Sequence, residues 1–291
     1  MSAARSVVIV GPGRVGLGLG YALKQAGAVD ELTVCGRRQD PPAHPLFTQG
    51  MARYSFGLEV PRPGTEAIFL AVPDAVLPEM AHALAAQGPA PEECAAFHLS
   101  GALVTDVLSP LHARGYAVGS FHPLQAIAHP VTGAERLAGS YIAVSGAPVA
   151  VATARRLAAA LGSPILTVPE TWRARYHAAA VMASNFLPPL LDAACRILEG
   201  AGVPHEDALP ALLPLVRGTL SNIEELGLDA AVTGPVARGD TETVELHLRA
   251  LDGGDRRLYA LLGRELARIV GNGLDEDVRR ALLERFEEGV K

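Results

Sequence analysis

Lysine is almost missing from this sequence. Lys24 and Lys291 are the only two in 291 residues, so arginine carries nearly all of the positive charge. Lys24 falls inside a segment with helical periodicity, and Lys291 is the last residue. Neither is placed to act on a substrate, so we expect no Schiff-base or proton-transfer chemistry by a lysine.

Cysteine pairs, an excess of positive charge and long apolar runs are also missing. The three cysteines are scattered without metal-ligand spacing, which argues against disulfides and structural zinc, and we predict no metal site. A net charge of −6 gives no footprint for nucleic acid or an anionic membrane. The longest charge-free run, 176–191, is shorter than a membrane span and contains two prolines. We expect a cytoplasmic protein without a signal peptide, because the first apolar strand begins within a few residues.

Short apolar runs alternate with helical patterns through the first half of the chain. Continuous runs of this kind are typical of strands covered on both faces, and a strand–helix succession predicts a parallel sheet. After about residue 168 only helical patterns remain. We therefore predict an α/β fold with two domains: a Rossmann-type parallel sheet domain at 1–168 and an all-helical domain at 169–291. The expected strands are 6–11, 31–36, 67–72, 95–100, 116–121, 140–145 and 165–168; the expected helices are 14–27, 75–87, 104–114, 149–161, 171–201, 205–226, 240–252, 255–271 and 275–288.

A glycine-rich turn follows the first predicted strand. Gly11, Gly13 and Gly16 form a G-x-G-x-x-G at the start of a helix. In such a motif the first glycine permits the turn, the second lets a pyrophosphate approach the backbone, and the third lets helix pack on strand. We predict a dinucleotide site with these cofactor-binding residues: Gly11, Pro12, Gly13, Arg14, Val15 and Gly16.

The end of the second strand decides which dinucleotide is preferred. NAD-specific sites carry an acidic residue there for the ribose hydroxyls, but this chain has Gly36 followed by Arg37 and Arg38. Two guanidinium groups can bind a 2′-phosphate, which favours NADP. Asp40 lies close enough to leave NAD open.

Polar residues follow the other predicted strands at the edge where ligands of such sheets bind. Val72-Pro73 and Ser100 are expected to contact the cofactor, and Ser100 is also a candidate to bind substrate or cap the next helix. His122 ends a predicted strand and is held by Pro123, so it is a candidate proton donor because its free pKa is near neutral. A structural histidine remains the alternative. Gln125 is a candidate substrate ligand.

Five longer motifs carry a family resemblance. They are LAVPDAVLPEM, FHLSGALVTDVLSPL, GSFHPLQAI, YHAAAVMASNFLPPLL and TGPVARGDTETVELHL, in that order along the chain. Together they resemble Rossmann-like proteins that carry the domain of unknown function DUF2520. The fold is similar to those of pyrroline-5-carboxylate reductase, 6-phosphogluconate dehydrogenase and the coenzyme F420-dependent NADP reductases. The resemblance implies a nucleotide domain followed by a helical domain that often dimerises.

The helical half adds candidates from the last two motifs. His177 and Ser184 fall on one helix face with Asn185 beside them; we expect this apolar helix to be buried and His177 and Asn185 to be catalytic, with a structural polar network as the alternative. Related β-hydroxyacid dehydrogenases have a lysine where this chain has Val181, which argues against that chemistry. Arg238, in a loop that Asp240 or Thr241 caps, is a candidate substrate clamp. The other histidines, His98 among them, show no constellation.

These observations favour an NADP-dependent reductase of a small carbonyl or imine substrate. Hydride would come from the nicotinamide and a proton from His122 or His177, oriented by Ser100 and Asn185. The alternatives are an NAD(P)-binding sensor or scaffold without turnover, or an NADP reductase linked to coenzyme F420. We also expect a homodimer through the helical domain, because the helix at 171–201 is apolar on more than one face.

Overall fold

The computed structural model describes residues 5–291 and divides into two compact units, 1–184 and 185–291. Each unit is described here by itself. The division falls between Ser184 and Asn185, later in the chain than the boundary expected after residue 168. The segment that carries His177 therefore belongs to the sheet-containing unit.

The first unit is built on one mixed sheet in the order β3-β2-β1-β4-β5-β6-β7-β8. The order reverses between β1 and β4, which is the switch point where ligands of doubly wound sheets bind. The strands are β1 (Ser6–Val10), β2 (Glu31–Gly36), β3 (Arg53–Phe56), β4 (Thr65–Leu70), β5 (Ala95–His98), β6 (Ala117–Pro123), β7 (Ile142–Gly146) and β8 (Ile165–Thr167).

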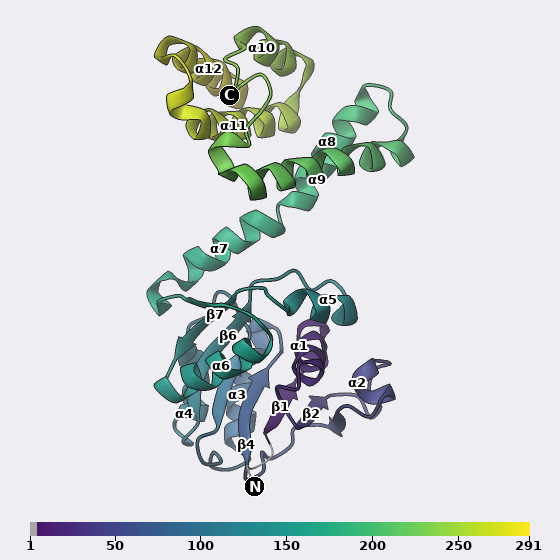
Figure 1. Cartoon of the computed structure of the whole chain (residues 1–291), viewed down its shortest axis with the longest axis vertical. Helices are drawn as coiled ribbons and strands as arrows, with labels where there is room; N and C mark the ends of the chain where they lie inside the picture. Colours follow the sequence, from purple (N-terminus) through teal and green to yellow (C-terminus); the bar gives the residue numbers. More distant parts are fainter. Residues whose placement is uncertain (1–4) are drawn as a thin grey trace. The chain divides into compact units, whose positions relative to one another are not determined.

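Helices cover both faces of this sheet (Figure 1). One apolar cluster joins one face to α1, α5 and α6, and a second joins the other face to α3 and the η2–α4 segment. Helices α1 and α5 pack side by side. The helices are α1 (Arg14–Gln25), α2 (Pro45–Thr48), α3 (Leu77–Ala85), α4 (Ser109–His112), α5 (Pro130–Leu137), α6 (Pro148–Ala160) and α7 (Arg173–Ser184), with 3-10 turns η1 (Asp74–Val76), η2 (Thr105–Leu108) and η3 (Glu170–Trp172).

The sheet confirms the Rossmann-type prediction and corrects it in two places. Strand β7 runs antiparallel to β6, because the chain leaves β6 into the short helix α5 on α1 and re-enters the sheet in the opposite direction. Strand β3 was not predicted: the sequence Arg53–Phe56 has only half-buried or exposed side chains and lies at the sheet edge. An edge strand shows neither a continuous apolar run nor a full alternation.

The predicted helix at 171–201 is two helices. Helix α7 ends at Ser184, a turn follows at Asn185 and Phe186, and α8 begins at Leu187. Pro188 and Pro189 therefore lie in the first turn of α8 instead of kinking a continuous helix. Proline is tolerated in a first turn because the N–H it lacks has no partner there in any case.

The second unit is entirely helical within its described residues. Its apolar core joins α10, α11 and α12 around Phe286, whereas α8 and α9 pack mainly on each other. Helix α9 includes Pro210 and Pro214 and is broken at Gly227, whose φ is 79°. The helices are α8 (Leu187–Gly200), α9 (His205–Ala230), α10 (Thr241–Ala250), α11 (Gly253–Val270) and α12 (Glu276–Val290).

One described segment, Glu170–Gly200, is long and apolar enough by length and composition to cross a membrane. Its 31 residues include an 18-residue window of mean hydropathy 1.3, of which 6% is buried. The helix expected to be buried at 171–201 is thus largely uncovered in this single chain. The charge-free run that we considered too short for a span is part of this longer helical segment.

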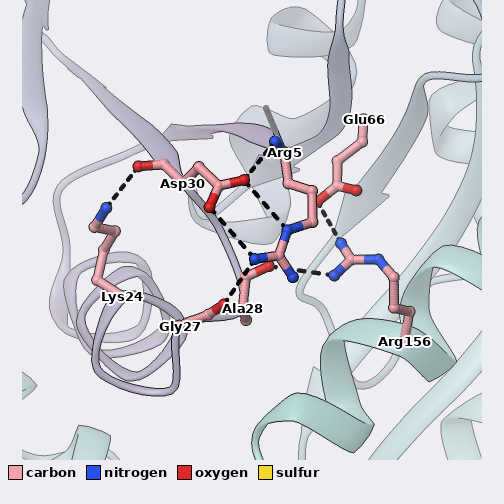
Figure 2. Close-up of polar contacts among 7 residues, drawn as sticks. All are labelled: Arg5, Lys24, Gly27, Ala28, Asp30, Glu66 and Arg156. Atoms are coloured by element: carbon pink, nitrogen blue, oxygen red, sulfur yellow. Dashed lines mark hydrogen bonds and ion pairs between the residues drawn. The ribbon is translucent and has the colours of Figure 1, made fainter. Parts of the chain in front are cut away.

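A network of hydrogen bonds and ion pairs joins neighbouring segments at the amino-terminal ends of the strands (Figure 2). The Asp30 carboxylate accepts hydrogen bonds from the backbone N–H of Arg5 at 2.8 Å and from its guanidinium at 3.3 Å. Lys24 donates to the Asp30 carbonyl at 2.7 Å, and Arg156 of α6 forms an ion pair with Glu66 of β4. Lys24, one of the two lysines, therefore has a structural partner.

Three phenylalanines pack against one another at the centre of the sheet, one pair stacked and two pairs edge-to-face. Phe69, Phe97 and Phe121, on β4, β5 and β6, are each 0% exposed, with ring centroids 5.1 to 6.0 Å apart. Their rings join three adjacent strands on one face. This cluster lies directly behind the carboxyl ends of β5 and β6.

We expect Phe97→Ala to lower the free energy of unfolding of the first unit by about 3–5 kcal/mol, because it leaves a cavity in a closely packed core. Phe56→Ala is the matched control, because Phe56 is 63% exposed on the edge strand β3. Urea unfolding followed by the fluorescence of Trp172, the single tryptophan, reports on this unit. Equal losses in the two variants would contradict the assignment of the core.

Candidate functional site

The glycine-rich turn has the geometry that a dinucleotide requires. Gly11 has φ +111°, and a Cβ there would overlap the Ala71 carbonyl; a Cβ at Gly16 would overlap the Gly11 carbonyl. Both positions therefore exclude side chains, so that β1, β4 and α1 can approach one another closely. A Cβ at Gly13 would meet no atom within 4 Å. The space above Gly13 is open, as expected where a pyrophosphate lies against the backbone.

The start of α1 is free to hold an anion. Gly13 is its N-cap, no side chain caps it, and its first turn has no acidic residue. The N–H groups of Arg14, Val15 and Gly16 have no helical acceptor, and the helix dipole makes this end positive. Arg14 and Val15 are exposed. The turn fits the phosphates of a dinucleotide without any change of backbone.

The end of β2 is shaped by Tyr54, a residue that sequence reasoning missed. A Cβ at Gly36 would overlap the Tyr54 hydroxyl, which donates to the Arg38 carbonyl at 2.7 Å. The place of the acidic residue in NAD sites is thus filled by a phenol from β3. Arg37, Arg38 and Asp40 are all exposed.

Ser100 lies after β5, at the carboxyl edge, and is 8% exposed. Its hydroxyl donates to Asp74 of η1 at 2.8 Å and accepts from the N–H groups of Ala102 at 3.2 Å and Leu103 at 3.1 Å. The hydroxyl therefore holds the turn after β5 and does not cap the following helix, because the N-cap of η2 is Val104 and has no side-chain bond. Val72 and Pro73 lie beside it, after β4.

His122 lies within β6, paired with Ala143 of β7, rather than after the strand as predicted. Its Nδ1 is 2.7 Å from the Tyr176 hydroxyl of α7, and its ring meets that of His177 edge-on at 5.8 Å. A Cβ at Gly101 would overlap Nδ1 of His177 and lie 2.8 Å from Nε2 of His122. The two predicted catalytic histidines, His122 and His177, therefore both lie close to the backbone of Gly101.

A buried arginine lies beneath this pair. Arg173 is 0% exposed and donates from Nη2 to the Ser100 carbonyl at 2.6 Å. Its Nε and Nη1 have no hydrogen-bond partner among the described residues, and no ion pair to it is formed there. The guanidinium carbon lies 5.6 Å from the centre of the Tyr176 ring. Burying a guanidinium costs free energy, which the Glu170 carboxylate offsets in part, and its positive charge acts on the titratable groups nearby.

The surroundings of His122 and of His98 favour the neutral form of each imidazole. Burial lowers the pKa of His122 to about 4, helped by the positive charge of Arg173 and by His177 and His98. Burial and Arg173 likewise lower the pKa of His98 to about 4. The fold therefore lowers the pKa of His122 well below the near-neutral value of a free histidine. His98 is 0% exposed and both its ring nitrogens lack partners among the described residues, so it belongs to this cluster, contrary to our reading of it as incidental.

Glu170 fixes the start of α7 against the sheet. Its carboxylate accepts from the N–H of Thr105 and from the hydroxyl of Ser145, both at 3.0 Å. Ser145 of β7 in turn lies 2.9 Å from the hydroxyl of Ser120 on β6. These bonds place Arg173 and Tyr176 over the end of β6.

Four other predicted residues are exposed, two in the first unit and two in the second unit. Gln125 is exposed and bonds backbone on both sides, to the Arg136 carbonyl at 3.1 Å and from the Ala126 N–H at 2.9 Å. Ser184 is exposed at the end of α7, and Asn185 is exposed at the start of the second unit. Arg238 is exposed in the second unit, in the loop that Asp240 caps at α10.

Tyr176 and Arg173 were missed by sequence reasoning. Tyr176 is next to His177, and Arg173 lies one helical turn before it, so the pattern R-x-x-Y-H puts them on adjacent helix positions. The sequence contains no sign that this arginine is buried. Only the bond to the Ser100 carbonyl reveals it.

The chain is similar to known proteins in two ways. Residues 1–123 match the Rossmann-like domain, and residues 140–266 match the domain of unknown function DUF2520. No curated protein matches the sequence.

Three solved structures with low identity share the fold over most of the chain. A candidate NADP oxidoreductase from Bacteroides fragilis is 22% identical and covers 91% of this chain and 98% of its own, with a TM-score of 0.69. A pyrroline-5-carboxylate reductase from Coxiella burnetii is 13% identical and covers 100% of both chains, with a TM-score of 0.62. A reductive aminase from Aspergillus terreus, in complex with NADPH and ethyl levulinate, is 18% identical and covers 99% of this chain and 94% of its own, with a TM-score of 0.59.

At these identities the neighbours establish the fold, and the two domain matches establish the family relationship that the five motifs predicted. The glycine turn, His98 and His122 lie in the Rossmann-like match, and α7 with His177 lies inside the DUF2520 match. The chain is a Rossmann-like protein with a DUF2520 domain.

Proposed function

We propose that the protein is an NADP-dependent reductase of a small carbonyl or imine compound. One observation carries the proposal: an open glycine cradle and a converging pair of histidines lie at the carboxyl edge of one sheet, within one unit. The fold neighbours named as NADP oxidoreductase, pyrroline-5-carboxylate reductase and reductive aminase support the reaction class.

The residues of this chain would bind and orient both reactants. Gly13 and the first turn of α1 hold the pyrophosphate, and Arg37 and Arg38 hold the 2′-phosphate. A bound reduced nicotinamide supplies the hydride. His122, from its free Nε2, gives a proton to the oxygen or nitrogen of the reduced bond, while His177 shapes the site beside it.

NADP is favoured over NAD because Gly36 cannot be replaced by an acidic residue while Tyr54 fills that space. The exposed Arg37 and Arg38 supply two positive groups without a fixed partner in the described structure. Asp40 is the remaining group that would accept from a ribose hydroxyl, so NAD binds more weakly in this proposal.

We expect NADPH to bind more tightly than NADH. Changing both Arg37 and Arg38 to Ala should weaken NADPH binding about tenfold or more and have little effect on NADH binding. The reason is that each charge-assisted bond to the 2′-phosphate contributes roughly 1.5–3 kcal/mol. Titration calorimetry measures both affinities. Arg155→Ala, on an exposed face of α6, controls for lost positive charge. Gly13→Ala should abolish binding of both nucleotides without loss of stability; equal affinities for the two nucleotides would contradict the role of the arginines.

A second function is favoured by one observation. With its pKa lowered to about 4, His122 is not an imidazolium at neutral pH, and neither lysine lies in the cluster. A protein that senses NAD(P) without turnover needs no proton donor. The two functions differ in what a change at His122 does.

We expect His122→Asn to lower turnover by about 10²–10⁴-fold while the nucleotide affinity stays the same, because only proton delivery is lost. The assay follows NADPH oxidation with ethyl levulinate, cyclohexanone plus allylamine, and pyrroline-5-carboxylate, the compounds that the neighbours' names suggest. His112→Asn, on an exposed turn, is the control. Nucleotide binding without turnover of any of these compounds would favour the sensor.

We propose a homodimer through the helical unit. Large apolar side chains are exposed on its helices, with Leu215, Leu226 and Leu228 of α9 at 66%, 58% and 62% exposure. Helices α8 and α9 bury few side chains in the single chain. Exposed apolar side chains concentrated on one pair of helices are typical of an interface, and a second copy would cover them.

We expect light scattering to show a dimer at micromolar concentration. Changing Leu215 and Leu226 to Glu should convert it to a monomer, because two charges would be buried in an apolar interface. Val60→Glu, at a position 49% exposed in the first unit, should leave the dimer intact. A monomeric wild-type chain would overturn this proposal.

A further inference from the structure

His122 is in contact with a phenol that the proposed reduction has not used. The Tyr176 hydroxyl lies 2.7 Å from Nδ1 of His122, with the two rings perpendicular at 89°. At this distance the two groups are hydrogen-bonded, and the phenol O–H donates to Nδ1 when the ring proton of His122 lies on Nε2. Nε2, on the opposite side of the ring, makes no hydrogen bond within residues 5–291 and faces Gly101. The imidazole therefore contacts a phenol through Nδ1 and has no hydrogen-bond partner at Nε2 within the described residues.

His122 cannot deliver a proton by itself. Its positive form is disfavoured by burial and by Arg173, His177 and His98. Asp74 and Glu170 offset part of this effect at His98, whereas every group that acts on His122 lowers its pKa. A neutral imidazole can release its Nε2 proton only if Nδ1 takes up another at the same time, since otherwise an imidazolate would form.

Tyr176 can supply that second proton. Its phenol is half-buried, and burial raises its pKa while the positive charge of Arg173 acts in the opposite direction. Arg173 is 0% exposed and has no ion-pair partner among the described residues. The guanidinium lies 5.6 Å from the centre of the phenol ring. A phenolate formed here would place a second negative charge near the buried guanidinium, in addition to that of Glu170.

We propose that Tyr176 acts through His122 as a proton relay for the reduction, with Arg173 as the counter-charge of the transient phenolate. The relay rests on the proposed function and takes a reduced nicotinamide as the hydride source. As the substrate carbon accepts hydride, its oxygen or nitrogen takes the Nε2 proton of His122. The phenolic O–H of Tyr176 breaks and an N–H bond forms at Nδ1, so the imidazole stays neutral. Solvent then returns a proton to Nε2 while the Nδ1 proton moves back to the phenolate oxygen, which restores the starting tautomer of His122 and the phenol of Tyr176.

The relay requires one particular tautomer of His122, and this can be read without turnover. We expect two-bond ¹H–¹⁵N correlation spectra of the ¹⁵N-labelled chain at pH 7 to show His122 neutral, with its proton on Nε2 and Nδ1 as acceptor. A proton on Nδ1 would overturn the relay, because His122 would then be donating to the phenol oxygen. A charged His122 at pH 7 would overturn it as well.

The second unit contains a matched pair outside the cluster. His247 Nδ1 lies 2.8 Å from the Tyr259 hydroxyl, with ring centroids 5.6 Å apart at 89°, the same arrangement as His122 and Tyr176. The Tyr176→Phe variant should shift the His122 nitrogens and leave those of His247 unchanged. Tyr259→Phe should do the reverse. A Tyr176→Phe spectrum in which the His122 nitrogens do not move would overturn the contact itself.

A kinetic measurement separates the relay from the proposed function. With a compound that the wild-type chain reduces, Tyr176→Phe should lower kcat on the order of 10²-fold and leave KM and the NADPH affinity unchanged. Tyr259→Phe should leave kcat unchanged. A Tyr176→Phe variant with wild-type kcat would overturn the relay while the reductase stands. If NADPH does not bind, the reductase fails, and the tautomer of His122 still decides whether the phenol is its donor.

Discussion

The hydrogen bond from the Arg173 guanidinium to the Ser100 carbonyl is the contact on which the candidate site depends. It joins the first residue of α7 to the turn after β5, and with the Glu170 bonds it holds that helix against the sheet. Because the guanidinium is fully buried, its positive charge reaches the neighbouring groups with little screening by solvent. His98 and His122 are neutral largely because they are buried, and this charge adds to that effect.

A neutral histidine changes the kind of proton chemistry open to this edge of the sheet. An imidazolium stores a proton that it can give away alone, whereas a neutral ring passes protons only from one nitrogen to the other. His122 is neutral at neutral pH and therefore holds no imidazolium proton that it could release directly. In the proposed relay a proton therefore passes from the Tyr176 hydroxyl through His122 to the substrate, and solvent replaces it afterwards.

The fold was predictable where the sequence pattern is local. The glycine turn, the order of buried strands and the break of α9 near residue 226 all follow from short-range signals such as a G-x-G-x-x-G, apolar runs and a glycine with positive φ. Strand β3 and the reversed β7 could not be predicted, because an edge strand has no continuous apolar run and strand direction depends on where α5 packs. The split of the helix predicted at 171–201 coincides with Pro188 and Pro189, which lie in the first turn of α8.

The site was predictable in its position and less so in its electrostatics. His122 and His177 were expected to face one another from different elements, and they do. Their partner Tyr176, the buried Arg173 and the buried His98 were not found, because burial of a polar side chain depends on tertiary contacts that leave no trace in spacing. Ser184 and Asn185 were expected on a buried face, which fails because α7 ends there and its last turn is exposed.

The overlap of any Cβ at Gly36 with Tyr54 limits how the nucleotide preference of this protein can be redesigned. The usual exchange toward NAD places a carboxylate at the end of β2, and here that single substitution would push the Tyr54 ring away and break its bond to the Arg38 carbonyl. A redesign would have to shorten the side chain at residue 54 first and introduce the acid second. Selection acting on single substitutions would meet the same obstacle, so the proposed preference for NADP would depend on Tyr54 of β3 as well as on Arg37 and Arg38.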